Sequence, residues 1–222
     1  MSERVVAVDG PAGAGKSSAS RGLAERLGFT YVDTGAMYRA VGILARDRGV
    51  ALEDDGALEH LIDGLRIDAA GERLVVDGRD LSAAVRTPDA GELASRVSTR
   101  PVVRDRLVAL QRRLGRGGNV VMEGRDIGTV VFPDAGLKIF LTASPEERAR
   151  RRAREFAARG DAADERQLAA DIARRDRRDS ERAISPLRPA ADAIIVDTSE
   201  LDLATVVSRL EALARDRWPL TS

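Results

Sequence analysis

Five short apolar runs recur along the chain, and segments with a helical pattern separate them. The runs cover residues 4–9, 29–33, 119–123, 137–142 and 193–197. This alternation predicts an α/β fold with a parallel five-stranded sheet flanked by helices. Because such sheets bind ligands beyond the carboxyl ends of their strands, we expect the functional site near the acidic residues at these ends: Asp9, Asp33, Glu123 and Asp197.

Two regions depart from this alternation. Residues 65–86 alternate apolar and polar side chains around Asp77-Gly78, a dipeptide typical of hairpin turns. Residues 145–182 are mostly charged with helical spacing, interrupted by Arg159-Gly160-Asp161, and predict a mobile flap. We therefore expect one domain over 1–222, with a core (about 1–35, 101–145 and 190–222), an insert (about 36–100) and a lid (about 146–182).

Composition narrows the class of protein. The chain has 222 residues, enough for a sizeable core, and its formal net charge is zero. This balance argues against a protein that tracks a nucleic-acid backbone, which would carry a basic excess. The absence of cysteine excludes disulfides and thiolate metal sites. With no signal peptide and no apolar stretch long enough to span a membrane, we expect a cytoplasmic protein.

The first apolar run leads directly into a glycine-rich segment, AVDGPAGAGKSS at 7–18. Gly10, Gly15, Lys16 and Ser17 satisfy G-x-x-x-x-G-K-[ST], the phosphate-binding loop between a strand and a helix. Glycine lets backbone N–H groups turn toward a polyphosphate, and the following helix adds the positive end of its dipole. The predicted ATP-binding residues are Gly10, Pro11, Ala12, Gly13, Ala14, Gly15, Lys16, Ser17 and Ser18.

The alternative is a Gly- and Ala-rich connection that merely turns the chain. Lysine usage argues against it, because Lys16 and Lys138 are the only lysines among 36 cationic residues. A slim ammonium fits between phosphate oxygens where a planar guanidinium does not. We therefore predict that Lys16 is a catalytic residue.

Four later blocks extend the pattern over nearly the whole chain. They read DTGAMYRA at 33–40, EGRDIGTVVFPDA at 123–135, KIFLTASPEERARRR at 138–152 and RRDRRDSERAISPLRPAADAIIVDTS at 174–199. In this order and spacing the blocks resemble bacterial cytidylate kinases, of the nucleoside monophosphate kinase family of P-loop kinases. The resemblance implies a P-loop kinase core with an inserted monophosphate-binding lobe and a helical lid. It also implies transfer of the γ-phosphoryl group of ATP to CMP or dCMP.

The resemblance assigns roles around the acceptor. An acceptor phosphate is already an anion, so no general base is required and catalysis reduces to alignment, water exclusion and charge compensation. Thr34 and Arg39 would lie near the acceptor, with Arg39 gripping its phosphate as a planar fork. Arg125 would be a second phosphate clamp. For Arg39, a surface salt bridge is the alternative.

The resemblance also predicts a base pocket. Asp126 would read cytosine, because the exocyclic amine of this base donates to a carboxylate. Ser95 and Arg104 would complete the pocket. On the residues alone, ELASRVSTRPVVRDRL is equally consistent with an amphipathic helix followed by a second helix that starts at proline.

The charged stretch supplies further candidates. Arg175, Asp179 and Arg182 fall at i, i+4 and i+7, on one helical stripe. By resemblance, Arg175 and Asp179 would bind the ribose and Arg182 would reach the phosphate, whereas the alternative is a solvated run of ion pairs. Arg148 and Arg152 share a helical face, and one or both would swing over ATP when the flap closes, as catalytic residues ranked behind Lys16.

Magnesium is the expected cofactor, with ATP as phosphoryl donor. Ser17 would bind the ion directly through its hydroxyl. Asp33 would hold a magnesium-bound water. Glu123 lies at a strand end where an acid assists magnesium in phosphate-loop enzymes, and because aspartate is the commoner direct ligand there, we expect Glu123 to bind through water as well.

Other functions stay open on the sequence alone. One is a kinase of the same fold that acts on another nucleoside monophosphate such as UMP, or on a hydroxyl acceptor such as shikimate, which would need a base. Another is a nucleotide-binding switch without turnover. We expect a monomer whose partners are ATP and CMP or dCMP, with neither nucleic acid nor membrane as partner.

Overall fold

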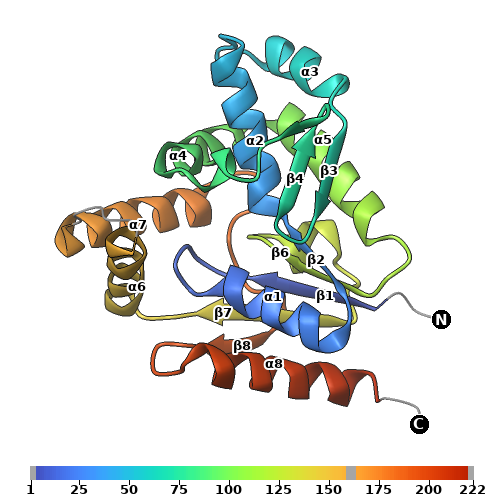
Figure 1. Ribbon diagram of the computed structural model, residues 1–222, viewed down its shortest axis with the longest axis vertical. Coiled ribbons are helices and arrows are strands. Elements are labelled where there is room, and N and C mark those ends of the chain that lie inside the picture. Colours follow the sequence, from blue (N-terminus) through green and yellow to red (C-terminus); the bar gives the residue numbers. More distant parts are fainter. Residues whose placement is uncertain (1–3, 159–163, 220–222) are drawn as a thin grey trace.

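A parallel sheet forms the centre of the molecule. The computed structural model describes residues 4–158 and 164–219. The strand order is β2-β6-β1-β7-β8, and every neighbouring pair is parallel (Figure 1). The strands are β1 (Val5–Asp9), β2 (Thr30–Asp33), β6 (Val120–Glu123), β7 (Leu137–Thr142) and β8 (Ile194–Asp197). The five predicted strands are confirmed, each beginning at or one residue after its predicted start.

Helices cover both faces of this sheet. Val6 and Val8 belong to the apolar layer that includes α1 (Lys16–Leu27) and α8 (Leu203–Arg217). Ala7 belongs to the opposite layer, with α2 (Thr34–Asp47) and α5 (Pro101–Gly115). Adjacent strand residues point to opposite faces, so a strand between two layers must be apolar at every position. β1 meets this condition because all its residues are buried.

The insert between α2 and α5 contains a second, antiparallel sheet in the order β3-β4-β5. Its elements are α3 (Asp55–Asp63), β3 (Ile67–Ala70), β4 (Arg73–Val76), β5 (Arg79–Asp80), the short 3₁₀ turn η1 (Ala84–Arg86) and α4 (Pro88–Val97). The predicted turn at Asp77-Gly78 joins β4 to β5, and both residues have positive φ (51° and 80°), as a type I′ turn requires. At the other turn, Gly71 N donates to Tyr31 O of the edge strand β2 at 3.0 Å.

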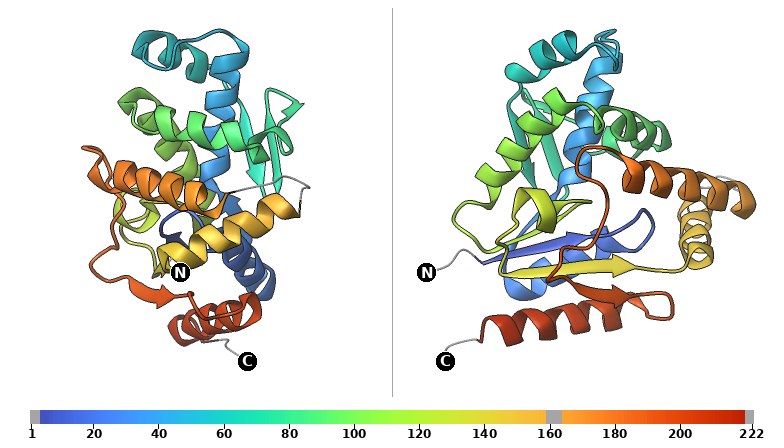
Figure 2. Two further views of the ribbon diagram at one scale, coloured as in Figure 1. Left: turned by 90° about the vertical axis from the view of Figure 1, so that its left-hand side faces the viewer. Right: turned by 180° about the vertical axis from the view of Figure 1, so that it is seen from behind.

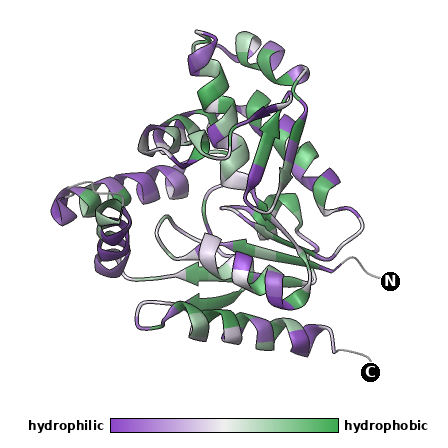
Figure 3. Cartoon of the chain, viewed as in Figure 1, coloured by the Kyte–Doolittle hydropathy of each residue, from purple (hydrophilic) through white to green (hydrophobic). Residues whose placement is uncertain are grey.

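The charged stretch forms two packed helices, α6 (Pro145–Ala157) and α7 (Glu165–Glu181). They lie beside the carboxyl ends of β1 and β7 and are the most hydrophilic helices in Figure 3 (Figures 1–3). The predicted break at Arg159-Gly160-Asp161 lies outside the described residues, and the predicted mobility stays a prediction. Within the described ranges, no helix combines the length and the apolar character needed to cross a membrane.

Candidate active site

The loop between β1 and α1 has backbone angles that favour glycine at three positions. Gly10 has φ 148°, and a Cβ there would lie 2.0 Å from the carbonyl oxygen of Leu141 on β7. Gly13 and Gly15 have φ 78° and 82°. Thr198, which follows β8, helps to hold the loop in place, because its buried hydroxyl donates to Ala14 O at 3.2 Å. The phosphate-loop pattern therefore has the strand, turn and helix that it predicts.

Lys16 begins α1 and is held inside this loop. Its Nζ donates to Pro11 O at 2.7 Å, and only 6% of the residue is exposed. Burial, followed by the positive charge of Arg125, lowers the pKa of Lys16 to about 7. The negative charges of Glu123 and Asp9 only partly offset this effect, and a bound phosphate would stabilise the charged ammonium further.

Two carboxylates, Asp33 and Glu123, lie side by side at the ends of neighbouring strands, and Glu123 interacts with this lysine. Glu123 ends β6, and burial together with the charge of Asp33 raises its pKa, against the attraction of Lys16. The Tyr31 hydroxyl donates to Glu123 Oε1, and the Ser17 hydroxyl also hydrogen-bonds to this carboxylate. A hydroxyl and paired carboxylates are oxygen ligands suited to magnesium.

Asp33 already has protein partners for both of its oxygens. Oδ1 caps α2 by accepting from Ala36 N at 2.9 Å, and Oδ2 accepts from Arg39 Nη2 at 2.7 Å. Glu123 is therefore the better placed of the two acids to reach a metal-bound water. The described residues contain no cluster of three or more acidic, histidine or cysteine side chains that would form a complete metal cage. A magnesium ion bound here would take its other ligands from phosphate oxygens and water.

Several arginines converge beside the loop. Burial, and then the charge of Arg125, lowers the pKa of Arg175 to about 10, and Arg39 and Arg152 contribute in the same direction. Asp179 opposes them and accepts from Arg125 Nε at 3.1 Å. No described residue hydrogen-bonds to the buried Nε atoms of Arg39 and Arg175. Cations that repel one another and have unused donors are suited to binding an anion. Arg39 also forms a salt bridge, the alternative interpretation of this residue, and its partner is Asp33.

The predicted base pocket has a buried ion pair at its centre. Arg104 donates to Asp126, and the two side chains are 3% and 8% exposed. Arg182 Nη2 lies 3.9 Å from Asp126 Oδ1, and the Arg104 guanidinium lies 6.0 Å from the centre of the Tyr38 ring. Arg104 is thus buried, whereas an arginine on the polar face of an ordinary amphipathic helix would be exposed to solvent. A carboxylate between two arginines is held in place by them, and its oxygens can accept a hydrogen bond from an amine.

Thr34 and Ser95 each have a protein partner. The Thr34 hydroxyl donates to Glu123 O at 2.7 Å and so joins α2 to β6. The buried Ser95 Oγ accepts from Arg178 Nη1 at 2.7 Å. Their predicted contacts with CMP stay predictions, and for Thr34 a ligand contact would use the lone pairs of the hydroxyl.

The predicted helical stripe is correct for Arg175 and Asp179 but wrong for Arg182. α7 ends at Glu181, and Arg182 has the extended angles φ −61° and ψ 138°. The cause is local, because Pro186 cannot continue a helix and the residue before it, Ser185, has φ 52°. The turn places Arg182 beside Asp126, at the base pocket.

The two predicted lid arginines differ. Arg148 is buried, donates to Ala12 O at 3.2 Å and pairs with Asp176 of α7, so it holds the loop to the lid. Arg152 pairs at 2.8 Å with Glu155, an exposed partner that binds weakly. Of the two, Arg152 is better able to turn toward a ligand.

Sequence reasoning assigned no role to two residues at the loop, Arg151 and the strand-end acid Asp9. Arg151 Nη1 donates to Thr198 Oγ1 at 3.0 Å and lies 3.4 Å from the point where a Cβ on Gly15 would be. Within a run of arginines, no signal singled it out. Asp9 accepts from Ile127 N and Gly128 N, each at 2.8 Å, and burial raises its pKa to about 6. Asp9 thereby ties β1 to the short π-helical turn η2 (Ile127–Val131), which follows Asp126.

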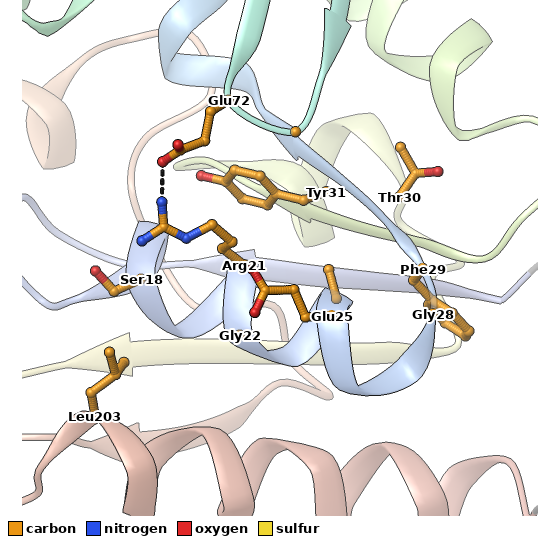
Figure 4. A pocket seen from close by; sticks show the side chains of 12 residues that line it. Ser18, Arg21, Gly22, Glu25, Gly28, Phe29, Thr30, Tyr31, Glu72 and Leu203 are labelled. Carbon is orange, nitrogen blue, oxygen red and sulfur yellow. Dashed lines mark hydrogen bonds and ion pairs between the residues drawn. The ribbon is translucent and has the colours of Figure 1, made fainter.

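A cavity of about 730 Å³ lies elsewhere, on the outer side of α1 (Figure 4). Of the predicted site residues only Ser18 lines it, and Arg21 and Glu72 pair across it. Because these charges neutralise each other and no converging cations face it, the cavity is not the phosphate site. Ser18 lines this cavity, so its predicted contact with ATP has the weakest structural support.

Comparisons with known proteins agree with this geometry. The family described as Cytidylate kinase matches residues 6–216. The chain is 53% identical to a cytidylate kinase of Pelotomaculum thermopropionicum, over 93% of this chain and 94% of that protein. It is 49% identical to one of Mycobacterium leprae, over 98% of each.

A solved structure of an uncharacterized protein from Eubacterium ventriosum has a TM-score of 0.52 at 12% identity, over 96% of this chain and 99% of that one, and supports the fold alone. The sequence matches cover nearly the whole chain, which is therefore an enzyme that phosphorylates CMP and dCMP with ATP and belongs to the cytidylate kinase family.

Proposed function

We propose that ATP and CMP meet between the loop 10–18 and α7, and that the converging arginines hold the two phosphate chains in line. The observation that carries this proposal is that the buried Arg175 lies near Arg39, Arg125 and Arg152, whose positive charges lower its pKa, while its Nε has no hydrogen-bond partner among the described residues. A protein gains nothing from placing these cations together unless an anion joins them. The phosphate of CMP and the γ-phosphate of ATP are such anions.

On the donor side, backbone N–H groups of the loop would bind the phosphates of ATP, and Lys16 would leave Pro11 O for the outer phosphate oxygens. Ser17 would hold magnesium directly, with Glu123 and then Asp33 behind it. When bound, this ion neutralises charge on the β- and γ-phosphates. The negative charges of Glu123 and Asp33 would keep this site favourable for magnesium even though the positive charge of Lys16 is close.

On the acceptor side, the chain's residues need only position the CMP phosphate and neutralise its charge. The CMP phosphate attacks without giving up a proton to the protein, so no base is needed. This phosphate would be bound by Arg39, Arg125 and Arg175. Arg152 would add positive charge beside the phosphoryl group that is transferred. Asp179, on the same face of α7, would accept from the ribose hydroxyls.

Base choice would depend on Asp126. Its carboxylate, oriented by Arg104 and Arg182, accepts from the amine of cytosine, whereas uracil presents a carbonyl oxygen that the carboxylate repels. This contact favours CMP over UMP. A hydroxyl acceptor fits less well, because the two acids paired with acceptor arginines already have protein partners: Asp33 accepts from Ala36 N and Arg39, and Asp179 accepts from Arg125.

A coupled assay with CMP, dCMP, UMP and AMP tests the proposal. We expect turnover with CMP and dCMP, loss of turnover with every acceptor in Lys16→Ala, and a selective loss with cytidine nucleotides in Asp126→Ala. Equal losses with all bases in Asp126→Ala would contradict the assignment of the base reader. ADP release that requires no acceptor would contradict the acceptor site.

The remaining expectations concern partners. We expect the chain to act as a cytoplasmic monomer on small nucleotides, without nucleic acid or membrane. Its balanced charge supports this expectation.

A further inference from the structure

Arg178 connects the lid to the insert at the edge of the base pocket. It extends from α7, and its Nη1 donates to Ser95 Oγ of α4 at 2.7 Å and lies 3.3 Å from Glu92 Oε1. The Arg178 side chain is 41% exposed, whereas Ser95 is 5% exposed. An exposed arginine therefore reaches inward to a buried hydroxyl.

This contact fixes what the hydroxyl can offer to a ligand. A serine hydroxyl has one proton and two lone pairs, and its proton rotates to suit its partners. Because a guanidinium only donates, Arg178 occupies a lone pair of Ser95 and the proton must turn elsewhere. Ser95 thus becomes a donor toward its remaining neighbours.

The face of α4 that carries Ser95 is turned toward the proposed ligand site. Gly91 lies one helical turn before Ser95, and a Cβ on Gly91 would lie 3.7 Å from Arg175 Nη1. Ser95 therefore belongs to the face that meets the converging arginines. A donor on this face suits an acceptor atom of a ligand.

We propose that Arg178 is a positioning residue that turns the Ser95 proton toward N3 and O2 of cytosine. The inference rests on the proposed function and deepens it. Cytosine N3 accepts a hydrogen bond, whereas uracil N3 carries a proton and donates. An oriented Ser95 proton therefore favours CMP over UMP, in addition to the contact of Asp126 with the amine.

The test measures kcat and KM for CMP and for UMP in Arg178→Met. We expect the CMP-to-UMP ratio of kcat/KM to fall about tenfold, the value of one good hydrogen bond, mainly through a higher KM for CMP. Arg178→Lys retains a donor and should restore most of the ratio. In a Ser95→Ala background, Arg178→Met should change the ratio no further.

Two controls separate this role from a structural one. Arg174→Met removes an arginine of the same helix that is 69% exposed and pairs with Asp171, and should leave the ratio unchanged. Glu92→Gln removes the ion pair of Arg178 but leaves its contact with Ser95, and should also leave the ratio unchanged. An unchanged ratio in Arg178→Met, or an equal fall in Glu92→Gln, would overturn the proposal.

The outcome is distinguishable from failure of the proposed function. If the unmodified protein did not convert CMP, the proposed function itself would fail. If it prefers CMP over UMP and Arg178→Met keeps that preference, only the role of Arg178 is wrong.

Discussion

The donor and acceptor halves of the site are built in different ways. The donor half is one continuous loop, and its shape depends on backbone angles that Gly10, Gly13 and Gly15 adopt. The acceptor half consists of side chains from separate segments: α2, α4, α5, α7 and the residues that follow β6. The first half is a property of the backbone, whereas the second exists only once distant elements have packed together.

This difference predicts different consequences of mutation. A change in the loop backbone should affect every acceptor and the stability of the fold. A change in an acceptor side chain should affect one step and leave the fold intact. The following predictions test that contrast, from the largest expected effect to the smallest.

Gly10→Ala should have the largest effect, because its Cβ would lie 2.0 Å from the Leu141 carbonyl oxygen at φ 148°. We expect a loss of about 3 kcal/mol or more in the free energy of unfolding, measured by urea denaturation, and loss of turnover with all acceptors. Gly28→Ala is the matched control, since Gly28 has φ 66° with nothing within 4 Å and should cost only about 1 kcal/mol. Equal losses of unfolding free energy in the two variants would contradict the close approach of Gly10 to Leu141.

Arg175→Met should separate activity from stability. The Nε of Arg175 has no hydrogen-bond partner among the described residues, and the neighbouring arginines repel its charge against the attraction of Asp179. We expect kcat/KM for CMP to fall roughly 10²–10³-fold with an unchanged or higher melting temperature. Arg174→Met should alter neither quantity. A variant that melts earlier but keeps full activity would assign Arg175 to structure instead.

ATP binding should depend on pH through Lys16. Its pKa is about 7 in the free protein, and the phosphates of ATP should raise it toward the ordinary value of about 10.4. Binding then takes up a proton above pH 7, so affinity should fall by up to about tenfold per pH unit between pH 7 and 9. Calorimetry in buffers of different ionisation enthalpy measures this uptake. Lys16→Met, which corrects for titration of ATP itself, should lose it.

Glu72→Gln should have the smallest effect. It removes the ion pair with Arg21 of α1, whose side chains are 42% (Arg21) and 59% (Glu72) exposed. Solvent screens such a pair, so we expect a change in unfolding free energy of about 0.5 kcal/mol or less and no change in acceptor preference. A large loss of CMP turnover would show that the hairpin tip controls the site.

The same contrast explains how much the sequence could predict. The strands, the Asp77-Gly78 turn and the phosphate loop follow from local patterns, and the structure has all of them. The roles of Arg39, Arg104, Arg125 and Asp126 came from a family resemblance, because their contacts join segments far apart in the sequence.

The errors and omissions have physical causes. The helical stripe failed at Arg182 because Pro186 and the turn at Ser185 end α7 early. Arg151 was missed because its neighbours in the chain are also arginines, and only packing against Thr198 distinguishes it. Arg148, one of the two arginines expected to swing over ATP when the flap closes, contacts Ala12 O in this structure, and its role toward ATP stays a prediction.

The most direct test of the account follows the phosphorus atoms themselves. Purified protein is mixed with magnesium, ATP and CMP, and ³¹P NMR records the products. The account predicts that the γ-phosphorus of ATP appears as the β-phosphorus of CDP, with an equal amount of ADP and no inorganic phosphate. Release of inorganic phosphate with unchanged CMP would contradict it.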